Sequence, residues 1–162
     1  MADPENTLLL ETSKGSVTIE LRPDLAPGHV ERIKELAREG FYDGIIFHRV
    51  IDGFMAQVGC PQGTGMGGSS KPDLKAEFNA EPHVRGTCSM ARTSAPHSAN
   101  SQFFICFDDA RFLDRPAALR EAAMHHYQVR RSRVSFPSLQ IQRLADPGNS
   151  ASTAHPVLGP VV

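Results

Sequence analysis

Short apolar runs alternate with polar residues along the first two thirds of the chain. Residues 7–12 and 16–21 form two such runs, and Ser13, Lys14 and Gly15 separate them. A glycine between two β-rich runs is typical of a hairpin turn. Further strand-like runs occupy residues 45–51, 54–58, 87–91 and 102–107. The pattern therefore predicts many short strands joined by tight turns.

One early segment has helical periodicity instead. Between residues 27 and 39, Val30, Ile33, Leu36 and Ala37 recur every three or four residues, and Gly40 follows where a helix commonly ends. This spacing predicts an amphipathic helix that lies on an apolar surface. Strands with a helix between the early ones predict an all-β to α+β fold, a closed or nearly closed antiparallel β-barrel capped by the helix.

The pattern changes near Asp114. Residues 117–134 are predicted to be helical, although their apolar positions form no clean stripe. Beyond them, prolines separated by Ser, Asn and Gly are typical of loop or disorder. We therefore expect a core at residues 1–114 and a divergent tail at residues 115–162.

Composition narrows the possible functions. The chain has 162 residues, which suits one domain, and a formal net charge of -1. This charge gives no reason to expect a nucleic-acid partner or electrostatic binding to a membrane, and no apolar run reaches the length of a membrane span. The acidic N-terminus does not resemble a secretory signal. Three widely spaced cysteines, Cys60, Cys88 and Cys106, form no C-x-x-C pair, and we interpret them as reduced packing residues of a cytoplasmic protein.

Three stretches carry the most specific signal. Residues 47–57 read FHRVIDGFMAQ, residues 86–91 read GTCSMA, and residues 100–105 read NSQFFI; FYDG precedes them at 41–44. In this order they resemble the signature of cyclophilin-type peptidyl-prolyl cis/trans isomerases, most of all the compact bacterial cyclophilins. The resemblance covers roughly residues 5–114. It implies the cyclophilin β-barrel and acceleration of X-Pro bond rotation in peptides and folding proteins, with no cofactor and no metal.

Rotation about an X-Pro bond requires no nucleophile. The barrier of about 18–20 kcal/mol comes from amide resonance, and an enzyme lowers it by binding the twisted amide better than either planar isomer. The twisted prolyl nitrogen gains a lone pair, which a fixed cationic donor stabilises. An apolar pocket must hold the proline ring, and hydrogen-bond donors must hold the flanking carbonyl.

By motif position, the resemblance makes Arg49 the catalytic cation. His48 is expected to have a structural role beside it, because the reaction needs no proton transfer. Strand alternation would put Phe47, Arg49 and Ile51 on one face of the sheet. The residues that the resemblance implies for substrate binding are Phe54, Met55, Gln57, Ala91, Arg92, Gln102, Phe104, Phe112 and Leu113.

Within that set, Phe54, Met55 and Phe104 would line the proline pocket, whereas Phe103 should remain in the core. Gln57 and Gln102 would contact Arg49 or the substrate backbone; as isolated residues, they could equally be hydrogen-bonded core amides. Family members usually have Asn after the alanine at position 91, or Arg in bacterial members. Arg92 therefore fits, with a contact made largely through its backbone.

Two other motifs favour simpler interpretations. Residues 63–68 match G-x-G-x-x-G, but Pro72 follows and no amphipathic helix begins there, so we expect a flexible loop at the rim of the groove rather than a nucleotide site. His83, His125 and His126 have no Cys or carboxylate at ligand spacing, which argues against a metal site.

After Asp114 the sequence departs from the family. Ala117 stands where a substrate-contacting Tyr or His is expected, and the closing strands and C-terminal helix have no convincing counterpart; residues 127–129 resemble one closing strand weakly. An out-of-frame or foreign tail would explain this composition. Three functions remain open: an active isomerase, a weakly active proline-peptide-binding or chaperone-like module, and a destabilised fragment. The implied partners are proline-containing peptides, unfolded proteins and cyclosporin-type macrocycles, and a monomer is expected.

Overall fold

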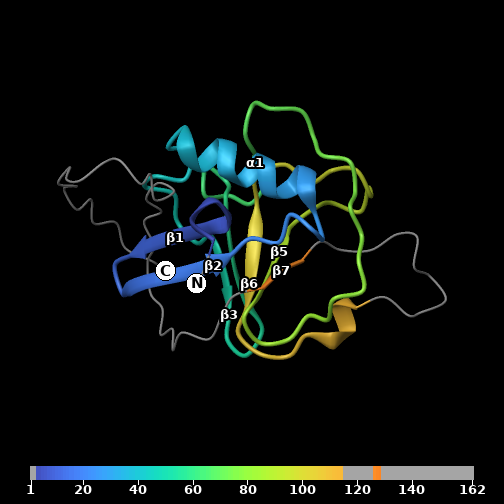
Figure 1. Ribbon diagram of the computed structural model, residues 1–162. Coiled ribbons are helices and arrows are strands. Elements are labelled where there is room, and N and C mark those ends of the chain that lie inside the picture. The colour runs from blue at the N-terminus through green and yellow to red at the C-terminus, as the bar shows by residue number, and fades with distance from the viewer. Residues whose placement is uncertain (1–2, 115–125, 129–162) are drawn as a thin grey trace.

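The computed structural model of the chain describes residues 3–114 and 126–128, in which an antiparallel sheet is covered by one α-helix (Figure 1). Seven strands follow the order β1-β2-β7-β5-β6-β4-β3. The predicted combination of antiparallel strands with a single early helix is confirmed. The elements are η1 (Pro4–Asn6), β1 (Thr7–Thr12), β2 (Gly15–Glu20), α1 (Pro27–Arg38), β3 (Arg49–Ile51), β4 (Met55–Val58), β5 (Thr87–Met90), β6 (Phe103–Cys106), η2 (Arg111–Leu113) and β7 (His126–Gln128).

The predicted hairpin is formed by β1 and β2. Thr12 pairs with Gly15 across a two-residue turn, and Gly15 has a φ of 126°, a backbone conformation that favours glycine. The Thr12 hydroxyl donates to the Gly15 carbonyl at 2.6 Å and accepts from the Lys14 N–H at 3.0 Å. The turn therefore fixes the register in which the apolar residues of both strands face the core.

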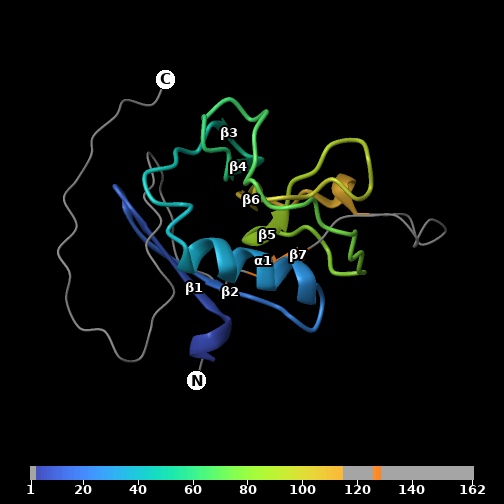
Figure 2. The same cartoon turned by 90° about the horizontal axis from the view of Figure 1, so that it is seen from above.

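Helix α1 lies across the sheet and buries the apolar stripe that its sequence predicts (Figures 1 and 2). At its C-terminus, the N–H of Gly40 donates to Ala37 and that of Phe41 to Leu36, which is the Schellman pattern with a glycine at φ 71°. At its N-terminus no side chain of the preceding residue caps the helix. Instead the Glu77 carboxylate, from a distant loop, accepts from the first helical N–H groups.

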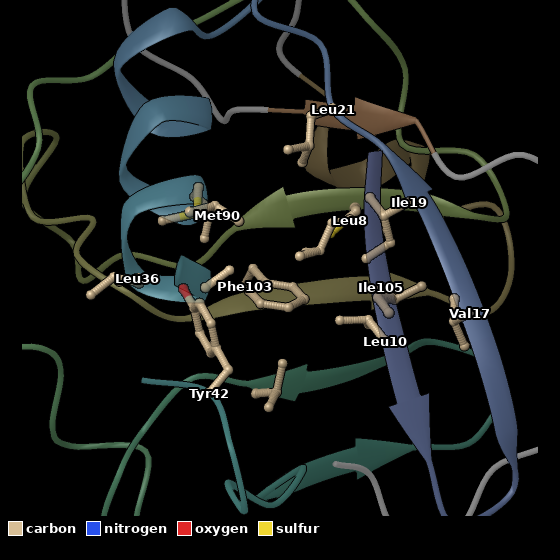
Figure 3. Close-up of a cluster of buried hydrophobic side chains, with 14 of the residues drawn as sticks. Leu8, Leu10, Val17, Ile19, Leu21, Leu36, Tyr42, Met90, Phe103 and Ile105 are labelled. Atoms are coloured by element: carbon tan, nitrogen blue, oxygen red, sulfur yellow. The ribbon is translucent and has the colours of Figure 1, made fainter. Parts of the chain in front are cut away.

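The strands β4, β5 and β6 have two differently packed faces. On the inner face, Phe103 and Ile105 pack with Leu8 and Leu10 of β1 and with α1 (Figure 3). The buried Tyr42 ring lies edge-on to Phe103 at 5.7 Å. On the outer face a smaller cluster contains Met55, Phe104, Cys106 and Ala110. Because neighbouring residues of a strand point to opposite faces, β6 serves the core through Phe103, as predicted, and the outer cluster through Phe104.

Two expectations need correction. The chain becomes a strand only at Arg49, not at residue 45, and the irregular backbone before it breaks the alternation. Phe47 is consequently buried in the main core, whereas Arg49 and Ile51 are exposed, so Phe47 does not share their face. The second correction concerns the predicted helix at 117–134. Residues 126–128 of it form β7, which joins β2 to β5; the remainder of that helix and the predicted disorder lie outside the described residues.

Candidate active site

A cavity of about 450 Å³ opens on the outer face of β3, β4 and β6. The strand register explains which side chains meet there, since Arg49 lies opposite Gln57 on β4 and Gln57 lies opposite Phe104 on β6. Directly opposed residues of antiparallel strands project to the same face, so these three side chains form a row across the sheet. The residues that line the cavity are Arg49, Phe54, Met55, Gln57, Met90, Ala91, Arg92, Thr93, Ser94, Phe104 and Leu113.

The floor of the cavity is apolar. Met55 and Phe104 are 2% and 6% exposed, and the half-buried Phe54, Ala91 and Leu113 pack around them. This arrangement suits a small apolar ring such as pyrrolidine, which would bury its methylene groups against the floor.

Two predicted substrate-binding residues do not line this cavity: Gln102, which lines a neighbouring one, and Phe112. The Phe112 ring is 74% exposed and lies 5.3 Å from the Phe54 ring, centroid to centroid. Phe112 therefore extends the apolar surface beyond the Phe54 side of the cavity and does not form part of its floor.

The Arg49 guanidinium lines the cavity, and no other group in the described part of the chain competes for its hydrogen bonds. Arg49 is exposed on the edge strand β3, and among residues 3–114 no side chain or carbonyl pairs with it. Guanidinium remains charged at every physiological pH and offers five N–H donors. These donors are therefore available to a ligand that binds in this cavity, which we call the apolar slot.

Gln57 and Gln102 contact each other instead of Arg49. The Gln57 side-chain N–H donates to the side-chain oxygen of Gln102 at 2.8 Å, and the Gln102 side-chain N–H groups donate in turn to the backbone carbonyls of Gly65 and Gly67 at 2.9 and 2.7 Å. Gln102 thus ties the glycine-rich loop to the sheet and lies in a second cavity of about 400 Å³ beside the first. In the described part of the chain no donor bonds to the side-chain oxygen of Gln57, so this oxygen can accept a hydrogen bond from a ligand.

The glycine-rich loop at 63–68 is not followed by a helix, which is the geometry that a dinucleotide site requires. His48 packs its ring against the loop, since a Cβ built on Gly65 would lie only 3.2 Å from it. Neither ring nitrogen of His48 has a hydrogen-bond partner in the described part of the chain. The ring therefore contributes packing, and it does not orient Arg49 through a hydrogen bond.

His83, which was not predicted as a site residue, supports the floor of the cavity from behind. This ring is fully buried and parallel to Phe104, with centroids 6.2 Å apart. Its Nδ1 lies 2.9 Å from an Asp114 oxygen, and its Nε2 lies 3.4 Å from the Ser89 hydroxyl. His83 thereby ties the segment that carries Leu113 to the sheet. No local signal could have shown this, because Asp114 is 31 residues away.

Met90, Thr93 and Ser94 also line the cavity without having been predicted. They flank the predicted Ala91 and Arg92. The sequence therefore predicted this segment of the cavity wall, but not these three residues. Ala117, expected to leave a substrate contact vacant, lies outside the described residues.

The described residues contain neither a cluster of metal ligands nor a helix that could span a membrane. Across residues 3–114 no group of three or more His, Cys, Asp or Glu side chains is placed to hold a metal ion. No helix in that part of the chain combines the length and the apolar character that crossing a bilayer demands.

Three histidines have a pKa below the ordinary value, chiefly because burial disfavours the charged ring. For His29 and His83, burial outweighs the opposing effects of Glu77 and Asp114, so that the pKa of each is lowered. For His48, the positive charge of Arg49 adds to burial and lowers the pKa further.

We expect the free energy of unfolding to decrease as the pH falls from about 7 to about 5. Through this range the unfolded chain binds more protons than the folded chain, because its histidines titrate near 6.5 and the folded ones at lower pH. Stability therefore rises with pH, and the slope vanishes below the folded pKa values. Urea unfolding at several pH values measures this pH dependence. A free energy of unfolding that stays constant between pH 7 and 5 would contradict the burial of neutral histidine rings. The variant His48→Gln should reduce the slope, since glutamine takes up no proton.

Comparisons with known proteins agree with this site. The family model for the cyclophilin type peptidyl-prolyl cis-trans isomerase/CLD domain matches residues 7–127, so the family resemblance continues past Asp114, where the motifs had appeared to end. A probable peptidyl-prolyl cis-trans isomerase of Brucella suis is 58% identical over 124 residues, with 70% of this chain and 63% of that protein covered. A peptidyl-prolyl cis-trans isomerase of Synechococcus elongatus is 45% identical over 106 residues, with 65% and 72% covered.

Solved structures give the same result. A cyclophilin from Hirschia baltica matches with a TM-score of 0.66 and 32% identity, over 78% of this chain and 65% of that one. A cyclophilin type peptidyl-prolyl cis-trans isomerase from Cryptosporidium parvum, crystallised in the presence of the dipeptide Ala-Pro, matches with a TM-score of 0.67 and 29% identity, over 76% and 78%. The chain spans less than two thirds of the length of the Brucella relative. With a family model matched over most of its length, the chain belongs to the cyclophilin-type peptidyl-prolyl cis-trans isomerases.

Proposed function

We propose that this protein accelerates cis/trans isomerisation of X-Pro bonds in peptides and in folding proteins. One observation carries the proposal: the Arg49 guanidinium, which pairs with none of the described residues, stands on the same face of the sheet as the apolar floor made by Met55 and Phe104. The presence of Ala-Pro in the crystals of the Cryptosporidium relative supports a proline-containing ligand.

In the proposed mechanism the proline ring enters the slot and the residues around it hold the peptide. As the amide twists, its nitrogen becomes pyramidal, and Arg49 donates a hydrogen bond to the emerging lone pair. The planar isomers have no such lone pair, because resonance delocalises it. The interaction is thus stronger in the transition state than in either ground state, which is the condition for catalysis. No covalent bond forms or breaks, so no cofactor enters the mechanism.

Gln57 is proposed to hold the substrate backbone next to the proline. Its amide is fixed by Gln102 at 2.8 Å, so that little rotamer freedom remains to be lost on binding. Ala91 is fixed as well, since its backbone N–H donates to the backbone carbonyl of Gln102 at 2.8 Å. A short side chain at this position lets a peptide pass close to the backbone of the sheet.

The decisive experiment follows the relaxation of a succinyl-Ala-Ala-Pro-Phe anilide after a solvent jump, with increasing amounts of the full chain. We expect the relaxation rate to rise in proportion to protein concentration. Saturable peptide binding without any acceleration would instead identify a proline-peptide-binding or chaperone-like module. Broad, non-cooperative thermal unfolding would identify a destabilised fragment.

Further properties are part of the same proposal. Cyclosporin-type macrocycles are proposed to compete for the slot, and the protein is proposed to act as a monomer. The three described cysteines are free and buried. We place the protein in the cytoplasm, where free thiols persist.

A further inference from the structure

Arg92 lies where the two cavities adjoin. It follows β5 in the loop after Ala91 and lines both the proline slot and the second cavity. One terminal nitrogen of its guanidinium donates to the carbonyls of Thr93 and Ser94 at 2.8 and 3.3 Å. The cation is therefore held in one orientation by its own loop.

The charge of Arg92 is not neutralised. In the described part of the chain no carboxylate forms an ion pair with it, and its buried Nε has no hydrogen-bond partner. A buried donor without an acceptor is unfavourable, and more so when the group is charged. An anionic ligand would supply the counter-charge that Arg92 lacks, and the planar fork of arginine suits a carboxylate, which accepts two parallel hydrogen bonds.

The proline slot as a whole is positively charged. Of the eleven residues that line it, only Arg49 and Arg92 are charged, and no carboxylate is among them. Asp73, which lines the second cavity, already accepts a hydrogen bond from Asn100 at 3.0 Å. Two cations around a concave, partly apolar site raise the local concentration of acidic ligands.

We propose that the side chain of Arg92 makes the enzyme prefer substrates with an acidic residue within two positions of the proline. This rests on the proposed isomerase function and adds a determinant of specificity to it. The acidic side chain would lie at the boundary of the two cavities, over the guanidinium, while Arg49 acts on the prolyl nitrogen. Arg92 thus contributes through its side chain, beyond the backbone contact predicted from the sequence.

The test uses matched peptides that contain Glu or Gln at each position within two residues of the proline. For the unaltered protein we expect kcat/KM to be roughly three- to tenfold higher for Glu than for Gln at one position or more, as for a partly buried ion pair. The preference should fall below about twofold in Arg92→Gln. In Arg92→Glu, a Lys peptide should be favoured over its Gln counterpart. Raising the salt concentration should weaken each preference.

The ratio between two peptides is an internal control, because partial unfolding of a variant lowers both rates equally. Arg38→Gln makes the same change in net charge on α1, where Arg38 pairs with Glu5, and should leave the ratio as it is in the unaltered protein. Equal rates for Glu and Gln peptides, or a preference that survives Arg92→Gln, would overturn the role of Arg92 and leave the isomerase function standing. Absence of acceleration for every peptide would overturn the proposed function itself.

Discussion

Replacing Arg49 with alanine is expected to lower kcat/KM for X-Pro isomerisation by about 100- to 1000-fold, the loss typical of removing one preorganised donor from a transition state. The effect should be large because the other donors around the slot are held in other contacts, Arg92 by the carbonyls of Thr93 and Ser94. Gln57, the neighbour of Arg49 across the strands, already donates to Gln102. The relaxation assay with an X-Pro anilide measures the loss directly.

The same replacement should leave the free energy of unfolding within about 0.5 kcal/mol of its original value. Arg49 is exposed on an edge strand and pairs with no other described residue, so alanine removes no packing and no ion pair. Urea unfolding of both proteins tests this. A large loss of stability would show that Arg49 supports the fold, and the activity result would then no longer report on catalysis.

Arg49→Lys is the matched control for the chemistry. Lysine retains the positive charge but replaces the planar fork with a single ammonium group on a flexible stem. We expect an intermediate rate, below that of the unaltered protein and above that of the alanine variant. If alanine and arginine catalyse equally, the assignment of Arg49 is wrong; if lysine is as poor as alanine, the geometry of the guanidinium matters more than its charge.

The site is rigid because its floor and the core share the same strands. Phe103 packs among the core residues, and Phe104 faces the slot and stacks on His83. Neither phenylalanine can move without shifting β6, which is paired on both sides, to β4 and to β5. An apolar slot built on central strands in this way is held in place before any ligand arrives, which reduces the cost of binding.

Much of the fold follows from local sequence patterns. The hairpin and α1 were predictable because their residues alternate at the periods of a strand and of a helix, and because Gly15 and Gly40 mark where these elements turn or end. The different roles of Phe103 and Phe104 follow from strand alternation once the motif indicates which of them faces the ligand. These features depend on neighbours within a few residues, and such neighbours are visible in a sequence.

What could not be predicted depends on contacts between distant segments. Strand alternation failed at Phe47 because the chain enters the core before it joins the sheet at Arg49. His83 depends on Asp114 for its position, and β7 has only three residues, fixed by pairing with β2 and β5 rather than by any apolar alternation. The motifs could name Gln57 and Gln102, but not that the two amides bind each other.

Directly after the C-terminal end of β4, the backbone at Gly59 comes very close to the backbone at Ser101 and Gln102. Gly59 has a φ of 99°, and a Cβ built there would lie 2.3 Å from the Ser101 carbonyl oxygen and 2.8 Å from the Gln102 Cα. Ser101 cannot easily retreat, because its hydroxyl donates to the Gly59 carbonyl and its own carbonyl accepts from the buried Tyr42 hydroxyl. Only glycine fits here, and the contact positions Gln102 for its hydrogen bond to Gln57.

Gly59→Ala is therefore expected to lower the free energy of unfolding by about 2–5 kcal/mol, combining about 1–2 for the left-handed backbone with about 1–3 for the overpacking. Gly44→Ala is the matched control, since Gly44 also has a positive φ, 74°, but nothing lies within 4 Å of its built Cβ. It should lose only the backbone contribution. Urea unfolding of the two variants measures the difference between their losses of stability, which isolates the clash with Ser101. Equal losses would mean that the two backbone segments can separate without a loss of stability. The contact between Gly59 and Ser101 would then not be what holds the site together.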